Sequence, residues 1–375
     1  MSTLDAKKRV GIDFGTSTTL VADRPPAGAP SCISVATDGG SWIPTLVGVN
    51  DRGTFLVGDD ALRLPAARII SSVKAAVTER RHWIEVRDAE GNLQAVRADE
   101  VISMLLDQIR LRLISFEPDF FSGAQTNMAC PASWDDEQRE RFLAAALSAG
   151  LDVSLDRLFD EPVAAGTAFL QHSEVAANAP LPNGWIVVVD AGGGTLDLAL
   201  LEHVDGQLTT LVTDGNDFAG DAVDRLVLDD IEAQAPAPPR WIDPHGSDTR
   251  AALLLRAARE LKEILTVEDT AERPLFGTST VLRYERARFE QLLTPMVQDL
   301  GDIVERLVRK ASDAGDAAPW SEVSAPVVAV QLAGGTTRIP LVKSSLEERF
   351  TGAKVGPDPL LQEHEAAVVA GLTYL

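Results

Sequence analysis

Residues 188–197 read VVDAGGGTLD, and residues 10–18 read VGIDFGTST. In both segments an apolar run leads to an aspartate, which is followed by glycine, a hydroxyl residue and further residues of a second strand-like run. Apolar runs on both sides of a glycine turn predict two strands joined by a tight hairpin. Because the pattern occurs once in each half of the chain, the sequence predicts two similar halves that each carry such a loop.

The composition of these loops suits the binding of phosphate and of a metal ion. Glycine lets the backbone approach a phosphate, and successive N–H groups and threonine hydroxyls can donate hydrogen bonds to its oxygens. A carboxylate repels phosphate, so we expect Asp13 and Asp190 to hold a hydrated Mg²⁺ that bridges to it. One loop alone could be an ordinary hairpin, but a third glycine-rich loop at 334–336 favours a nucleotide site.

Other nucleotide-binding patterns are missing from the sequence. The chain has neither a Gly-x-x-x-x-Gly-Lys-Ser/Thr loop nor a proper Gly-x-Gly-x-x-Gly loop, which disfavours P-loop and Rossmann folds. Strand-like and helical segments alternate in both halves, so we expect a duplicated α/β fold with one ligand cleft between the halves. Residues 61–77 have helical character, and Ser133 is the expected N-cap of a helix over 139–148, with Asp136 at the capping-box position.

The overall charge narrows the classes of partner. The 375 residues include 34 Lys+Arg and 56 Asp+Glu, which gives a net charge of −22. Such a charge repels nucleic acid and anionic membranes, so we expect neither as a partner. The chain has no apolar run of membrane-spanning length, and no apolar core follows Lys7-Lys8-Arg9 as in a signal peptide, so we expect a cytoplasmic location.

Further short motifs are spread from Gly11 to Leu372. They are Gly11-Ile12-Asp13-Phe14-Gly15-Thr16, Val57-Gly58-Asp59, Pro131-Ala132, Asp136-x-Gln138-Arg139, Glu161-Pro162-x-Ala164-Ala165, Asp190-x-Gly192-Gly193-Gly194-Thr195-x-Asp197, Arg286-x-Arg288-Phe289-Glu290 and Gly334-Gly335-Thr336-Thr337-Arg338-Ile339-Pro340. Together they resemble the nucleotide-binding domain of the heat-shock protein 70 (DnaK-type) chaperones. Actins and sugar kinases have similar phosphate loops but lack the Glu-Pro-x-Ala-Ala and Arg-x-Arg-Phe-Glu segments in this form.

This resemblance implies a duplicated actin-like ATPase (ribonuclease H-like) fold, with two lobes around a nucleotide cleft. Lobe I is expected to comprise 1–183 plus 358–375, with an upper subdomain over roughly 53–115. Lobe II is expected to comprise 184–357, with a reduced upper subdomain over roughly 221–288. A full chaperone continues into a substrate-binding domain, which has no counterpart in this sequence, so we expect either a stand-alone nucleotide-binding module or a shortened form of a longer protein.

The resemblance also implies roles in ATP hydrolysis. Lys74 matches the catalytic lysine, where a cation would stabilise charge on the γ-phosphate, although the sequence alone allows an ordinary surface lysine. Glu161 matches the glutamate that organises the metal and the attacking water, and Asp197 an aspartate that orients water. Thr16 and Thr195 match hydroxyls near the γ-phosphate.

The remaining matched positions are expected to contact ATP or ADP. The nucleotide-binding set is Gly15, Ser17, Thr18, Gly192, Gly193, Gly194, Gly220, Lys262, Thr266, Gly334, Gly335, Thr336 and Arg338. The Arg338 guanidinium can stack on a purine face. Two positions depart from the family: Arg259 replaces an acidic ribose-binding residue, and Glu263 replaces an apolar residue or arginine. By their spacing these two could instead form an exposed i,i+4 pair.

Three functions remain open at this level. The first is a slow Mg²⁺-dependent ATPase whose turnover is coupled to lobe closure. The second is a non-catalytic nucleotide switch or scaffold that recruits a protein partner or co-chaperone near Arg139 and Arg157, which match arginines that relay nucleotide state and contact partners. The third, a filament-forming actin relative, is disfavoured by the chaperone-type segments and by the charge.

Overall fold

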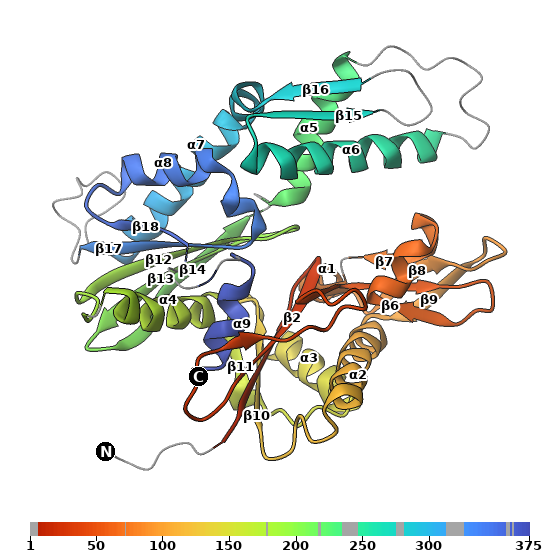
Figure 1. The fold of residues 1–375 in the computed structure, drawn as a ribbon, viewed down its shortest axis with the longest axis horizontal. Helices are drawn as coiled ribbons and strands as arrows, with labels where there is room; N and C mark the ends of the chain where they lie inside the picture. Colours follow the sequence, from red (N-terminus) through yellow and green to blue (C-terminus); the bar gives the residue numbers. More distant parts are fainter. Residues whose placement is uncertain are drawn as a thin grey trace.

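Two lobes, each built on one central β-sheet, make up the protein (Figure 1). The computed structural model describes residues 7–71, 73–177, 179–216, 219–234, 247–274, 281–312, 326–357, 361 and 364–375. Within these residues, no helix has both the length and the apolar character needed to span a membrane.

The central sheet of the first lobe has the strand order β11-β10-β1-β2-β3, and β4 also pairs with β2. β1 is antiparallel to β2 and parallel to β10, and β10 is parallel to β11. Its strands are β1 (Arg9–Phe14), β2 (Thr18–Arg24), β3 (Ser31–Cys32), β4 (Trp42–Pro44), β10 (Gln125–Cys130) and β11 (Leu158–Asp160).

The central sheet of the second lobe repeats this arrangement in the order β14-β13-β12-β17-β18. Two antiparallel pairings are again followed by two parallel pairings across the sheet. Its strands are β12 (Gly184–Ala191), β13 (Leu196–Val204), β14 (Gln207–Asn216), β17 (Val327–Ala333) and β18 (Lys354–Gly356). The duplication predicted from the two glycine loops is therefore present in the topology of both sheets.

Smaller elements extend each lobe on the same side of the molecule (Figure 1). In the first lobe these are β5 (Leu46–Val49), β6 (Phe55–Val57), β7 (Ile69–Ser71), α1 (Val73–Thr78), β8 (Trp83–Arg87) and β9 (Leu93–Arg97), which lead into the long helix α2 (Ala98–Phe116) beside α3 (Asp136–Ser148). In the second lobe they are α5 (Gly220–Gln234), α6 (Ser247–Val267), β15 (Thr270–Pro274) and β16 (Val281–Glu285). Further elements of the second lobe are the helices α7 (Arg286–Ala311) and α8 (Pro340–Arg349) and the 3₁₀ turn η5 (Gly335–Arg338), and the 3₁₀ turn η3 (Leu155–Arg157) precedes β11 in the first lobe.

The helix expected over 61–77 is mostly wrong. The segment contains two 3₁₀ turns, η1 (Gly58–Arg63) and η2 (Ala66–Arg68), then β7, and only its end is helical, in α1. Pro65 lies between the two turns and disfavours helical backbone at the residue before it. The β-branched Ile69 and Ile70 then pair with β5 instead of continuing a helix.

The helix after β10 begins at a different cap from the one predicted. α3 (Asp136–Ser148) has Asp135 as its N-cap, not Ser133. The Asp135 side chain accepts a hydrogen bond from the Gln138 amide (3.1 Å), and the Gln138 side chain accepts one from the Asp135 amide (3.0 Å). This reciprocal pair is a capping box, and it satisfies two donors at the helix start.

Two helices rich in small residues, α4 (Glu161–Ala177) and α9 (Ala366–Leu372), pack against each other and contact both central sheets (Figure 1). A Cβ atom added at Gly371 would lie 1.7 Å from the carbonyl oxygen of Ala164. A Cβ atom at Gly166 would lie 2.4 Å from Leu201 Cδ1 in β13. The small residues therefore let the two helices bring the lobes into direct contact.

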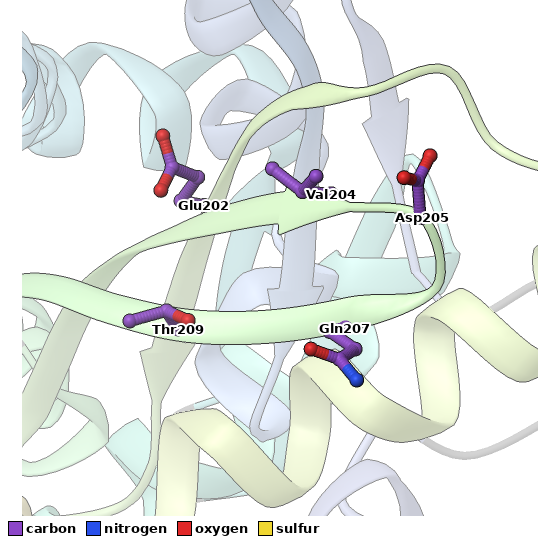
Figure 2. Close-up of a pocket in the computed structure, with 5 residues that line it drawn as sticks. All are labelled: Glu202, Val204, Asp205, Gln207 and Thr209. Atoms are coloured by element: carbon purple, nitrogen blue, oxygen red, sulfur yellow. The ribbon is translucent and has the colours of Figure 1, made fainter.

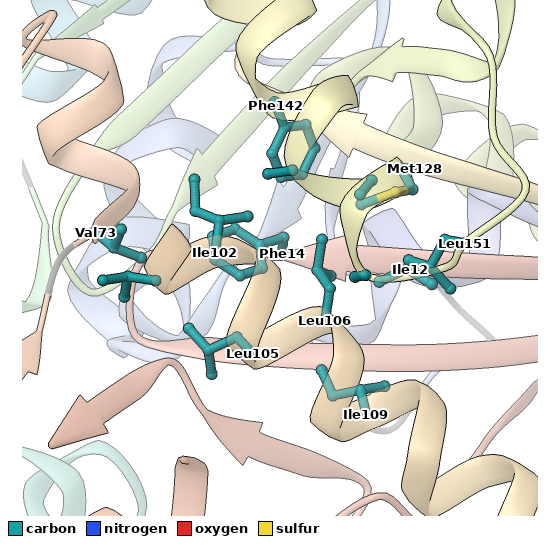
Figure 3. Packing of buried hydrophobic residues seen from close by; sticks show 14 of the residues in the cluster. Ile12, Phe14, Val73, Ile102, Leu105, Leu106, Ile109, Met128, Phe142 and Leu151 are labelled. Carbon is teal, nitrogen blue, oxygen red and sulfur yellow. The ribbon is translucent and has the colours of Figure 1, made fainter. Parts of the chain in front are cut away.

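An apolar core fills the first lobe between its central sheet and helices α2 and α3 (Figure 3). Ile12 and Phe14 of β1 meet Leu105 and Ile109 of α2 and Phe142 of α3, all 1% exposed or less. Each such side chain contributes about 1.5–3 kcal/mol to folding by its removal from water. Phe14 directly follows Asp13, so this core fixes the end of β1, where the first glycine loop begins.

We expect Gly371→Ala to destabilise the fold by about 3 kcal/mol, because the Ala164 backbone cannot move away from the added methyl group. Gly356→Ala is the matched control, since a Cβ atom there meets no heavy atom within 4 Å. Urea unfolding followed by circular dichroism measures both variants. Equal unfolding midpoints for the two would contradict the close packing of α4 on α9.

Candidate functional site

The two glycine loops have the same backbone geometry. Gly15 N donates to Thr18 O and Gly192 N donates to Thr195 O, both at 3.0 Å. In each hairpin the aspartate lies two residues before this glycine, at the end of the first strand. The structure thus places the predicted loop residues 15–18 and 192–195 at equivalent positions in the two lobes.

The two loops face each other at close range. A Cβ atom added at Gly193 would lie 2.2 Å from Ser17 Oγ, and one at Gly194 would lie 2.9 Å from Thr16 Cγ2. In the described part of the chain, the amides of these two glycines donate no backbone hydrogen bond. The loops therefore present hydroxyls and free N–H groups to one another, which are the donors that phosphate oxygens require.

Lys74 and Glu161 form a buried ion pair next to these loops. The Lys74 ammonium donates to Glu161 Oε1, and the two residues are 6% and 5% exposed. Lys74 comes from the short helix α1, and Glu161 is the first residue of α4. The alternative that Lys74 is an ordinary surface lysine is excluded by this burial.

Three aspartates complete the charged centre. Asp13 ends β1 next to its loop, while Asp190 in β12 lies directly opposite Asp197 in β13. The Thr195 hydroxyl donates to Asp197 Oδ2 at 3.1 Å, which ties the loop to this carboxylate. Together with Glu161, these aspartates place four carboxylates around the single ammonium group of Lys74.

Burial and charge crowding raise the pKa values of these carboxyl groups. Burial raises the pKa of Asp13 to about 6, and Lys74 opposes the shift. Burial raises the pKa of Glu161 to about 7, opposed by Lys74 and assisted by Asp197 and Asp13. The pKa of Asp190 is raised well above its usual value, first by burial and then by the three other carboxylates. The centre therefore carries excess negative charge when all four groups are ionised.

This donor set fits a hydrated divalent cation. Carboxylate oxygens are the ligands of Mg²⁺, which usually keeps several of its waters in protein sites. Across the described residues, no three His, Cys, Asp or Glu side chains are close enough to hold a metal ion directly. Contact through water, as expected for Asp13 and Asp190, is compatible with both observations.

The loop at 334–336 and the start of α5 converge on the second glycine loop. The Thr336 hydroxyl donates to Gly192 O at 2.7 Å, and Gly220 N donates to the same oxygen at 3.0 Å. Gly334 has φ +74°, and a Cβ atom there would lie 2.6 Å from Asp190 Oδ1. Gly220, Gly334 and Thr336, which are predicted to contact the nucleotide, thus lie close to the second glycine loop and Asp190.

Helix α6 adds a charged wall beside α5. Lys262 Nζ lies 2.7 Å from Asp224 Oδ1 and donates to Gly220 O at 3.3 Å. Arg259 donates to Asp224 Oδ2 at 2.9 Å and to Asp221 Oδ1 at 3.0 Å. The hydrogen bonds of Arg259 therefore go to α5, so the exposed i,i+4 pair with Glu263 is not the arrangement found.

Arg338 and Thr266, both predicted to contact the nucleotide, donate hydrogen bonds to other groups of the protein. Arg338 donates to Glu365 Oε2 at 2.9 Å, and a Cβ atom at Gly335 would lie 2.7 Å from the other oxygen of Glu365. The Thr266 hydroxyl donates to Lys262 O within α6 at 2.8 Å. Glu365 was not predicted, and its place beside Arg338 depends on a contact between distant parts of the chain.

The two arginines expected near a partner surface are both partly buried. Arg139 donates to Asp160 Oδ1 at 2.6 Å and to Trp134 O at 3.0 Å, and its side chain is 19% exposed. Arg157 is half-buried in η3. Arg139 is therefore linked to the residue that precedes Glu161.

The hollow shown in Figure 2 is distant from this centre. It is lined by Glu202, Val204, Asp205, Gln207 and Thr209 at the turn between β13 and β14. Asp197 lies near the opposite end of β13, and seven residues of strand span roughly 23 Å. The hollow is also bordered by two acidic residues, which do not suit a phosphate.

Paired hairpin loops that meet between two lobes of the same topology define the actin-like ATPase class of folds. A family model described as Hsp70 protein matches residues 9–370. The chain therefore belongs to the Hsp70 family.

Curated relatives agree with this assignment. The chaperone protein DnaK of Thermosipho melanesiensis is 27% identical over 391 residues, which cover 96% of this chain and 59% of that protein. The chaperone protein HscA homolog of Bordetella pertussis is 32% identical over 392 residues, which cover 97% of this chain and 57% of that protein. The chain thus spans a little over half the length of these relatives.

We expect Gly193→Ala to destabilise the protein by about 1–3 kcal/mol, because the added methyl group forces Ser17 and its loop away. Gly192→Ala is the matched control, since its nearest heavy atom would be Thr195 O at 3.8 Å. Urea unfolding in the absence of nucleotide measures both. If Gly193→Ala is as stable as Gly192→Ala, the loops do not meet as described.

We expect Asp190→Asn to raise the melting temperature of the metal-free protein by about 2 °C or more near pH 8, and by less near pH 5. Folding raises the pKa of Asp190, so the wild type loses stability as the pH rises from the unfolded-state value through the folded-state value. Asparagine does not titrate. Thermal unfolding in a chelator tests the difference, and a pH-independent or negative shift would contradict the charge crowding.

Proposed function

We propose that the protein binds ATP or ADP with Mg²⁺ between its lobes and hydrolyses ATP slowly to ADP and phosphate, coupled to lobe closure. The buried Lys74–Glu161 pair, placed beside two facing phosphate-type loops, is the observation that supports this function. A fixed cation in a site from which water is excluded stabilises the transition state strongly, because charge develops there on the transferring phosphoryl group.

Each group in the centre has a proposed role. Lys74 stabilises charge on the γ-phosphate, and Thr16 and Thr195 donate their hydroxyls to its oxygens. Glu161 and Asp197 orient the attacking water, and Asp13 and Asp190 hold the hydrated Mg²⁺. When bound, the ion supplies positive charge that offsets the four carboxylates and the phosphates.

The remaining loop residues form the proposed nucleotide contacts. Gly15, Ser17 and Thr18 in the first lobe and Gly192, Gly193 and Gly194 in the second line the phosphates. The adenosine side consists of Gly220, Lys262, Thr266, Gly334, Gly335, Thr336 and Arg338. Because the position matched to an acidic ribose-binding residue carries Arg259, which is held by Asp221 and Asp224, we propose that the ribose is bound weakly there.

A nucleotide-dependent switch without turnover is the second candidate. The link from Arg139 through Asp160 to the neighbouring Glu161 favours it, because a change at the centre would reach helix α3. A protein partner or co-chaperone would then contact the surface near Arg139 and Arg157. The lobes in this proposal are residues 1–183 with 358–375, and residues 184–357.

We expect Lys74→Ala to lower ATP turnover about 100-fold while ADP binding changes by less than tenfold, because the lost cation acts mainly in the transition state. Thr195→Ala should lower turnover to a smaller extent. Lys343→Ala, at an exposed lysine on α8, is the control. Release of inorganic phosphate and calorimetric binding of ADP give the two quantities.

The same measurements separate the two candidates. Turnover that is equal in the wild type and Lys74→Ala, with ADP binding retained, would reject hydrolysis and leave the switch. Loss of turnover in Lys343→Ala as well would show that the assay responds to general damage.

A further inference from the structure

The start of helix α3 contacts the elements that carry both partners of the Lys74–Glu161 pair. Gln138 and Trp134 contact the end of α1, which bears Lys74. Arg139 contacts Asp160, which directly precedes Glu161. We call residues 134–139 the α3 turn. One short segment thus holds the backbone on each side of the ion pair.

Both the oxygen and the nitrogen of the Gln138 side-chain amide form hydrogen bonds. Its oxygen accepts from Asp135 N at 3.0 Å, and its nitrogen donates to the carbonyls of Val77 and Thr78, each at 3.0 Å. The residue is only 5% exposed. Since the capping box fixes the oxygen, the nitrogen points toward α1 with little freedom to rotate.

Helix α1 needs such support because it has only six residues, Val73–Thr78. Helices of this length are unstable alone, and their last carbonyls lack partners within the helix. Gln138 donates to two of these carbonyls at once, those of Val77 and Thr78, and Val77 O also accepts from Arg80 N at 2.9 Å. The position of α1 is therefore set by the α3 turn as well as by its own hydrogen bonds.

A second path reaches the Lys74 backbone itself. Trp134 Nε1 donates to Thr78 Oγ1 at 2.9 Å, and this hydroxyl donates to Lys74 O at 3.2 Å. Trp134 is 4% exposed and packs edge-on against Phe142, with ring centroids 5.6 Å apart. The indole is thus fixed by the core of the first lobe.

We propose that Gln138 is a positioning residue that holds α1 so that the Lys74 ammonium lies where the reaction needs it. This inference rests on the proposed ATPase function. The Lys74 side chain is buried and paired with Glu161, so it has little room to compensate for a shift of the backbone that carries it. Misplacement of a catalytic group by about 1 Å can lower a rate by about 100-fold.

Gln138→Glu separates positioning from helix stability. Glutamate has nearly the same shape and serves the capping box as glutamine does, so α3 keeps its N-terminus. An ionised carboxylate cannot donate to the Val77 and Thr78 carbonyls. Gln138→Met is the second variant, because it removes the same donors without adding charge. Ala144→Gly, at an exposed position in α3, weakens the helix without touching α1 and is the control.

Four measurements on the whole chain test the proposal. ATP turnover at saturating ATP, ADP affinity and hydrogen exchange of residues 73–78 are compared among wild type, Gln138→Glu, Gln138→Met and Ala144→Gly. Single-turnover hydrolysis is then measured in Lys74→Ala with and without Gln138→Glu. We expect both Gln138 variants to lower turnover about tenfold, to leave ADP affinity within twofold and to speed exchange in α1.

The double variant identifies the route of the effect. If Gln138 acts through Lys74, adding Gln138→Glu to Lys74→Ala lowers the rate no further. Multiplicative losses, or an equal loss in Ala144→Gly, would overturn the proposal and leave a merely structural role. So would unchanged turnover or unchanged exchange in both Gln138 variants while Lys74→Ala remains impaired.

The result also distinguishes this inference from the proposed function. Equal turnover in the wild type and Lys74→Ala would reject hydrolysis itself, and the catalytic consequence of Gln138 with it. Impaired Lys74→Ala with normal Gln138 variants would reject the positioning role alone.

Discussion

The buried ion pair between Lys74 and Glu161 is the constraint on which the rest of the site depends. An unpaired charge in such surroundings would be neutralised or would oppose folding. The pair joins α1, in the upper part of the first lobe, to α4, which lies against both central sheets. Two separate parts of the molecule are therefore fixed to each other at the point where the glycine loops meet.

The pair does not balance the charge around it. Burial lowers the pKa of Lys74, but Glu161 and then Asp13 and Asp197 outweigh this and raise it, so the ammonium stays charged. Four carboxylates still face one cation. The imbalance lowers the stability of the protein in the absence of a metal and favours binding of a cation. Affinity for a metal and instability without it therefore have one physical origin.

The sequence predicted the parts of the fold that local pattern controls. The two glycine loops could be predicted because an aspartate, glycines and a hydroxyl residue lie between strand-like runs in both halves. The two central sheets confirm the duplication, since their strands follow the same order. The prediction of a helix over 61–77 was mostly wrong, because Pro65 and the pairing of Ile69 and Ile70 with β5 outweigh the local helical character. The N-cap at Asp135 was readable, since Asp135-x-x-Gln138 has capping-box spacing.

Contacts between distant residues could not be read in this way. The resemblance placed Lys74 in the site, but its depth and its pairing follow from the meeting of α1 and α4. Arg259 was predicted as a departure from an acidic ribose-binding residue or as half of an exposed pair with Glu263, and the structure joins it to α5. Glu365 and Gln138 were missed because their partners, Arg338 and the end of α1, are known only from the folded chain.

The close contact between α4 and α9 determines how the lobes can move. With a backbone carbonyl of Ala164 against Gly371, neither helix can slide along the other without collision. Close-packed helices of this kind resist shear, whereas rotation about the contact leaves its atoms in place. A small angular change at this helix pair would be magnified into a larger displacement at the far tips of α6 and β8–β9.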